Sequence, residues 1–114
     1  MERGDMKISE LVKKTGLKAI NKSEDKTIEG VYISDMASDI ITNAKANMLL
    51  ITLQTHKTLI AAANLIDVAA IVFVKGKKPG NDVIDLATKV GIALYYTEDD
   101  TWTLASKLTR LGIQ

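Results

Sequence analysis

The hydrophobic residues of this chain recur alternately with the period of a helix and with that of a strand, which limits the folds it can form. Helical spacing runs through residues 36–44, 55–65, 81–90 and 101–111. Between these stretches, short apolar runs occupy residues 48–52, 68–74 and 92–97. Helical connections of about ten residues require parallel strands, because antiparallel neighbours need only tight turns. The alternation therefore predicts an α/β domain with a mainly parallel sheet.

The amino-terminal part adds a short helix and two further strands to this prediction. The helix lies before Gly16, and residues 17–21 form a short strand that is either parallel or antiparallel. Residues 27–34, with Val31, Tyr32 and Ile33 at their centre, form the second strand. We therefore expect a single layered α/β domain over residues 7–114, with a sheet of about five strands flanked by helices. Residues 1–6 are expected to be an extension without a structural role.

Polar residues at the predicted helix starts are expected to act as N-caps, because their side chains accept hydrogen bonds from free backbone N–H groups. The candidates are Ser9 for the first helix, Ser34 or Asp35 for the second, and Asn81 or Asp82 for the fourth. The acidic residues 98–100 precede the last helix and suit its positive N-terminal end.

Composition excludes several classes of protein. The 114 residues carry a net charge of +1, which gives no electrostatic basis for binding nucleic acid or anionic lipid. The chain has no Cys and one His, His56, so we expect no disulfide, no thiolate nucleophile and no metal site. Its apolar runs are too short to span a membrane, and no targeting signal is apparent. We therefore expect a cytoplasmic protein without cofactors.

The carboxyl ends of parallel strands are where ligands collect in open α/β sheets. Hydroxyl, amide, imidazole and carboxylate groups follow the predicted strands there, enough to orient a small polar ligand. The candidate binding residues are Ser34, Asp35, Thr52, Gln54, Thr55, His56, Asp100 and Thr101. The loop 75–78 adds three lysines to this edge.

Each of these groups also has a simpler interpretation. Asp35 and Asp39 could form a metal-binding or an acid–base pair, but helix capping with solvent exposure is the commoner role of Asp at such positions. His56 could shuttle protons, or it could be a hydrogen-bonding residue of a loop. The lysines of loop 75–78 could hold phosphate or form a solvated turn, since the loop lacks the P-loop spacing. The chain also contains neither a Gly-x-Ser-x-Gly elbow nor a Gly-x-Gly-x-x-Gly fingerprint.

Trp102 lies at the start of the last predicted helix. Aromatic residues are enriched at interface cores, so Trp102 is a candidate anchor for a protein partner. Packing of the Trp102 side chain over the helix against the sheet is the other interpretation.

The order of several segments resembles the DRTGG-domain family. These segments are Asp25–Asp35, Ser38-Asp39, Ile51–His56, Ala69–Val72 and Asp100-Thr101. Lys26 stands where the family's motif has Arg, and Ile28-Glu29 interrupts the glycine pair before Gly30. The resemblance implies an accessory domain like the N-terminal domain of HPr kinase/phosphorylase and the DRTGG domain of pyrophosphatases with CBS domains. It implies dimer contacts or regulation, and no catalytic residues.

These observations lead to three hypotheses. The first is a non-catalytic regulatory or interaction domain that forms a homodimer and binds a small polar or nucleotide-like effector at the carboxyl ends of its strands. The second is a small phosphate-chemistry enzyme that uses Asp35 and His56 with the loop 75–78. The third is a scaffold that binds a protein partner through Trp102 and the last helix.

Overall fold

A five-stranded sheet runs through the middle of the molecule. Its strands are β2 (Lys18–Ala19), β4 (Val31–Ile33), β5 (Leu49–Thr52), β6 (Ala70–Phe73) and β7 (Ala93–Tyr96). The computed structural model describes residues 5–113 and orders these strands β2-β7-β6-β5-β4. The neighbours from β4 to β7 pair in parallel, whereas β2 pairs antiparallel with β7. The predicted α/β fold with a mainly parallel sheet is confirmed, and the first predicted strand is antiparallel.

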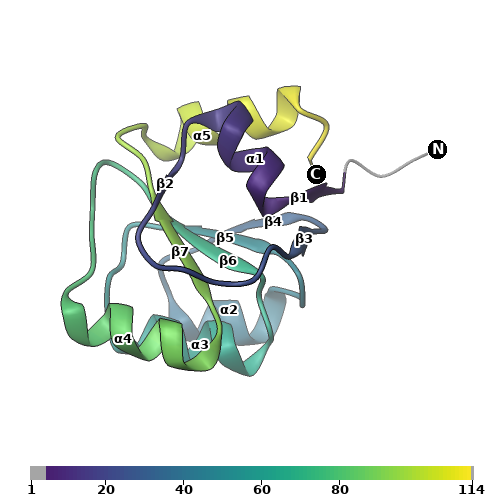
Figure 1. Cartoon of the computed structure of the whole chain (residues 1–114). Helices are drawn as coiled ribbons and strands as arrows, with labels where there is room; N and C mark the ends of the chain where they lie inside the picture. Colours follow the sequence, from purple (N-terminus) through teal and green to yellow (C-terminus); the bar gives the residue numbers. More distant parts are fainter. Residues whose placement is uncertain (1–4, 114) are drawn as a thin grey trace.

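Helices cover both faces of the sheet (Figure 1). They are α1 (Ile8–Thr15), α2 (Ala37–Asn43), α3 (Lys57–Leu65), α4 (Asn81–Val90) and α5 (Thr101–Arg110). In Figure 1, α1 and α5 lie above the sheet, and α2, α3 and α4 lie below it. The three helices that connect parallel strands therefore share one face.

Side chains of the central strands alternate between two cores. Leu49, Ile51 and Val72 pack with α1 and α5, whereas Leu50, Ile71 and Phe73 pack with α2, α3 and α4. All four residues of β5 and all four of β6 are buried. A strand covered on both faces must be apolar at every position, which is why these strands appear as continuous apolar runs in the sequence.

The prediction of one strand over residues 27–34 is wrong. The segment forms β3 (Thr27–Ile28) and β4, and β3 pairs antiparallel with β1 (Met6–Lys7) in a separate two-stranded sheet. Between them, the Glu29 N–H donates to the Asn47 carbonyl at 2.8 Å. The chain therefore passes from the two-stranded sheet to the five-stranded sheet across two residues, Glu29 and Gly30.

Strand β1 begins inside the segment that the sequence predicts to be an extension. Met6 pairs with Ile28, which is fully buried. Residues 1–4 of that segment lie outside the described residues. Within residues 5–113, no helix is long and apolar enough to cross a bilayer.

Three predicted N-caps are also wrong. The caps of α1, α2 and α4 are Lys7, Met36 and Gly80, and none of them makes a side-chain capping bond. The Asp25 carboxylate instead accepts from the Ser9 N–H at 2.9 Å and from the Ser9 hydroxyl at 2.7 Å. Asp100 does cap α5, as the acidic turn predicts, because its carboxylate accepts from the Thr103 N–H at 2.8 Å.

Candidate functional site

The carboxyl ends of β4 to β7 line one edge of the sheet, and the strand order decides which loops meet there. Loops after β4 and β5 are neighbours, as are loops after β6 and β7. Strands are spaced about 4.8 Å apart, so the ends of β4 and β7 lie about 14 Å apart. The candidate edge therefore has two halves, one around Asp35 and Thr52 and the other around Asp99 and Asp100.

Asp35 joins the loops after β4 and β5. Its Oδ1 accepts from the Thr52 hydroxyl at 2.8 Å and from the Leu53 N–H at 2.7 Å. The Thr52 oxygen in turn accepts from the Gln54 N–H at 3.1 Å. Thr52 is 2% exposed, so these bonds fix a buried hydroxyl beneath an exposed carboxylate. Three of the predicted residues, Asp35, Thr52 and Gln54, are thus brought together.

A second polar cluster adjoins this half, around Asp39 of α2. Its carboxylate accepts from the Tyr32 hydroxyl and from the Asn43 amide, each at 2.8 Å. Hydrogen bonds from Ser34, Asn43 and Tyr32 hold the pKa of Asp39 below its usual value of 3.8. The same bond to Asp39 raises the pKa of Tyr32 above 10.0. Asp39 therefore stays ionised and organises the end of β4.

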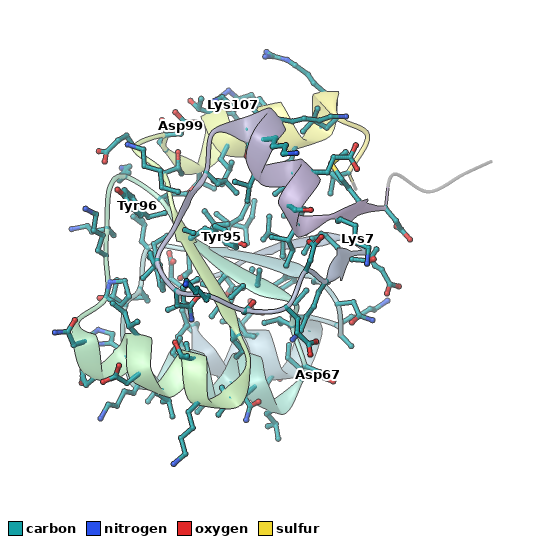
Figure 2. The ribbon with its side chains drawn as sticks, viewed as in Figure 1. Lys7, Asp67, Tyr95, Tyr96, Asp99 and Lys107 are labelled. Carbon is teal, nitrogen blue, oxygen red and sulfur yellow. The ribbon has the colours of Figure 1, made fainter. Side chains whose placement is uncertain are left out.

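The other half of the edge is closed by its own backbone. The Lys75 N–H donates to the Asp99 carbonyl and the Gly76 N–H donates to the Thr97 carbonyl, each at 2.8 Å. Asp99 also pairs with Lys107 of α5 at 2.6 Å, as Figure 2 shows. These contacts join the loops after β6 and β7 and leave little room between them.

The ammonium groups of two lysines lie over the ring of Tyr96, which ends β7 beside this closed half of the edge. Figure 2 shows the position of Tyr96. Lys78 Nζ lies 4.4 Å from the centre of the Tyr96 ring, and Lys18 Nζ lies 5.8 Å from it. Both distances fall within the range of cation–π attraction. Lys78 and Lys18 are therefore held beside this edge by an aromatic ring.

The remaining predicted residues lie at helix starts. Asp100 and Thr101 begin α5, where Asp100 is occupied as the cap. His56 is the exposed N-cap position of α3, and its side chain makes no capping bond. Thr55 precedes it in the loop after β5. In the first turn of α3 the Leu59 N–H donates to the His56 carbonyl at 3.1 Å, while the N–H groups of Lys57 and Thr58 have no side-chain cap; in α5 the Asp100 carboxylate takes the Thr103 N–H.

Trp102 is 80% exposed, so the interpretation that it packs against the sheet is wrong. It borders a shallow hollow of about 310 Å³ on α5, together with Ala105, Ser106, Thr109 and Arg110. Another hollow, of about 210 Å³, lies between α3 and α4. Among residues 5–113, no group of three or more His, Cys, Asp or Glu side chains is placed to hold a metal ion.

Comparison with known proteins decides the family. The DRTGG domain family matches residues 10–111. The chain belongs to the DRTGG domain family. A solved structure of the CBS and DRTGG domains from the regulatory region of a Clostridium perfringens pyrophosphatase, complexed with the activator diadenosine tetraphosphate, has a similar fold. The TM-score is 0.77 at 18% identity, over 93% of this chain and 47% of that chain. The chain thus spans about half the length of that protein, and no curated protein matches it.

The segment that resembles the DRTGG motif lies at the opposite edge of the sheet. Asp25 binds Ser9 at the start of α1, and Lys26 Nζ donates to the Gly91 carbonyl at 3.0 Å, just before β7. The Gly30 carbonyl accepts from the Leu49 N–H at 2.9 Å, where β5 begins. In this DRTGG domain the segment therefore joins α1 to the amino ends of the strands. The role of Asp25 is not predictable from the sequence, because its bond to Ser9 joins distant segments and leaves no local pattern.

Proposed function

We propose that this DRTGG domain is a non-catalytic regulatory domain that self-associates and binds a small, nucleotide-like anion at the carboxyl ends of β4 and β5. Family membership is the observation that carries the proposal. The similar domain belongs to a regulatory region crystallised with a nucleotide activator, and this chain contains no complete catalytic motif.

Chemistry of the β4–β5 half supports an anionic ligand. The start of α3 has no side-chain cap, and its first residue is Lys57, an exposed lysine whose Nζ lies 3.7 Å from Oδ2 of the exposed Asp82. Free N–H groups at a helix start and a nearby ammonium group both favour a phosphate. Gln54, Thr55 and His56 add donors in the preceding loop, while Asp35 is held by Thr52 and Leu53. In this proposal Asp35 links the loops after β4 and β5. The ligand binds at the start of α3.

Calorimetric titration with diadenosine tetraphosphate and with ATP tests the effector site. Two Lys→Ala variants make a matched pair, since Lys57 lies at the carboxyl edge and exposed Lys45 lies at the amino edge before β5. We expect Lys57→Ala to weaken binding about tenfold, which corresponds to about 1.4 kcal/mol, and Lys45→Ala to leave it unchanged. Absence of binding by the unmodified protein, or equal effects of the two substitutions, would contradict the proposed site.

Self-association is tested separately by light scattering over a range of protein concentrations. A dimer supports the proposal, and a monomer at every concentration contradicts this part of it. The light-scattering result does not depend on the ligand titration. Each experiment can therefore contradict self-association or effector binding without affecting the other.

The exposure of Trp102 favours a second candidate, a scaffold that binds a protein partner through α5. A large aromatic side chain that is 80% exposed beside a hollow is typical of an interface anchor. This hypothesis predicts that Trp102→Ala folds normally, by circular dichroism, and loses the partner in a pull-down. Retention of every partner by Trp102→Ala would contradict it.

A further inference from the structure

Strand β4 ends the five-stranded sheet, and within residues 5–113 no strand pairs with its outer edge. The Gly30 carbonyl and the Ser34 N–H bind β5, at 2.9 Å and 3.2 Å. Consecutive residues of a strand direct their N–H and C=O groups to opposite edges, so Val31 and Ile33 direct theirs away from β5. The outer edge of β4 therefore presents the N–H and the C=O groups of these two residues.

The two edges of the sheet differ in how they are protected. Strand β2, at the other edge, has two residues and begins with Lys18, and short length and lysine both discourage pairing with another chain. Strand β4 reads Val31, Tyr32 and Ile33, without a charged residue or a proline. Ile33 is also 50% exposed. The β4 edge is also short, with three residues, but it lacks the charged residue and the proline that usually prevent strand addition.

The space beside β4 is apolar. A hollow of about 220 Å³ lies between β4 and α5, lined by Val31, Ile33, Ala105, Leu108, Thr109 and Ile113. Side chains alternate along a strand, so Val31 and Ile33 face this hollow while Tyr32 faces α2 and binds Asp39. A strand added at this edge would place its own side chains over the hollow.

We propose that β4 pairs antiparallel with β4 of a second copy, about a two-fold axis at Tyr32, so that two five-stranded sheets become one continuous sheet. This inference rests on the self-association in the proposed function and names its surface. In this register Val31 of each copy lies opposite Ile33 of the other. The residues with outward N–H and C=O groups therefore face each other and exchange all their hydrogen bonds.

A second copy suits this edge because a two-fold interface must complement itself. Val31 and Ile33 are both β-branched, and such side chains pack well as cross-strand pairs on the α5 side. The Val31 and Ile33 side chains of one copy also cover the apolar hollow of the other copy. The two Tyr32 residues face each other at the axis, in a non-hydrogen-bonded pair.

Ile33→Lys tests the surface in the full chain by light scattering and sedimentation. The substitution places a charge at the centre of the proposed interface, and Ile33 is exposed enough for the monomer to fold. Leu65→Lys is the matched control, because Leu65 is 70% exposed at the end of α3. We expect the dimer dissociation constant to rise at least about tenfold in Ile33→Lys and to stay unchanged in Leu65→Lys.

Cysteine cross-linking tests the register, since the natural chain has no cysteine. Residues paired across antiparallel strands have Cα atoms about 4.5–5.5 Å apart, within reach of a disulfide. We expect Tyr32→Cys to cross-link with itself under mild oxidation. Because Tyr32 binds Asp39, a mixture of Val31→Cys and Ile33→Cys chains provides a second test, and Ala19→Cys on β2 is the control.

The outcomes separate this inference from the proposed function. A natural protein that is always monomeric contradicts both self-association and the β4 interface. A dimer that survives Ile33→Lys, and that forms no cross-link in Tyr32→Cys or in the mixed chains, contradicts the β4 interface alone. If Trp102→Ala dissociates that dimer, the interface lies on α5 instead, which also overturns the inference.

Discussion

At the scale of single residues, two carboxylates bind segments that are far apart in the sequence. Asp25 binds Ser9 at the start of α1, and Asp35 binds Thr52 and Leu53 after β5. Each satisfies a backbone N–H group that would otherwise have no partner within its own helix or strand. These two carboxylates therefore connect segments that are distant in the sequence.

The Asp25–Ser9 contact has a defined pH dependence. The Ser9 hydroxyl, and then its N–H, hold the pKa of Asp25 below its usual 3.8. A lowered pKa in the folded state stabilises the fold above the unfolded value and loses that effect as the pH falls through the folded value. We expect Ser9→Ala to raise the pKa of Asp25, measured by carbon NMR of its carboxyl group.

The same variant is expected to be less stable than the natural protein at neutral pH, with a difference that shrinks below about pH 3.8, the ordinary Asp value. Ser23→Ala is the control, because the Ser23 hydroxyl donates only to the neighbouring Glu24 carbonyl. A constant difference at all pH values would show that Ser9 acts without Asp25.

Thr52 links Asp35 to Gln54 from a buried position. Thr52→Val keeps the volume and removes the hydroxyl that donates to Asp35 and accepts from the Gln54 N–H. We expect a loss of about 1–2 kcal/mol in the free energy of unfolding, measured with urea. Thr97→Val is the comparison, because the Thr97 hydroxyl accepts only from the Asp99 N–H at 3.2 Å. A larger loss in Thr97→Val would contradict the linking role of Thr52.

At the scale of elements, glycines in the left-handed region end two helices. Gly16 follows α1 with φ of 76°, and Gly91 follows α4 with φ of 81°. Residues with a Cβ adopt this conformation at a cost, so glycine at these positions allows the chain to turn sharply into β2 and β7. Both helix ends are predictable from the sequence for this reason.

Gly91→Ala isolates the backbone cost. Apart from Gly91 and its two neighbours in the chain, no atom of the described residues lies within 4 Å of the position that the new Cβ would occupy, so the effect comes from φ. We expect a loss of about 1–2 kcal/mol in the free energy of unfolding by urea titration. Gly16→Ala is the comparison, since Gly16 also has a positive φ, of 76°, with nothing near the new Cβ, and we expect a similar loss there. An unchanged Gly91→Ala protein would mean that the turn can relax.

The central strands were predictable from the sequence because burial on both faces makes them continuous apolar runs. The two-residue strands β1 and β3 were not, because they are too short to show a period. Capping by Asp25 was missed because it lies 16 residues from Ser9. At the candidate site, parallel pairing correctly placed Asp35 beside Thr52, but it gave no sign of the backbone bonds between Lys75 and Asp99.

At the scale of the whole molecule, the path of the chain explains why half of the carboxyl edge is closed. From β4 to β7 each strand adds beside the previous one, and the connecting helices α2, α3 and α4 share one face (Figure 1). After β7 the chain crosses to the other face as α5. A crevice is expected where neighbouring strands lead to opposite faces, here between β6 and β7. In this domain the Lys75–Asp99 and Gly76–Thr97 bonds fill that place.

The two cores share one sheet, so we expect them to unfold together. Leu49 and Leu50 are neighbours in β5, both are fully buried, and they belong to opposite cores. Replacing either with Ala removes packing on one face only and is expected to cost about 2–5 kcal/mol. Urea unfolding followed by far-UV circular dichroism and by tyrosine absorbance should give one coincident transition in each variant, as for a small two-state domain. Separate transitions by the two probes would mean that the α1–α5 layer unfolds independently of the layer of α2, α3 and α4.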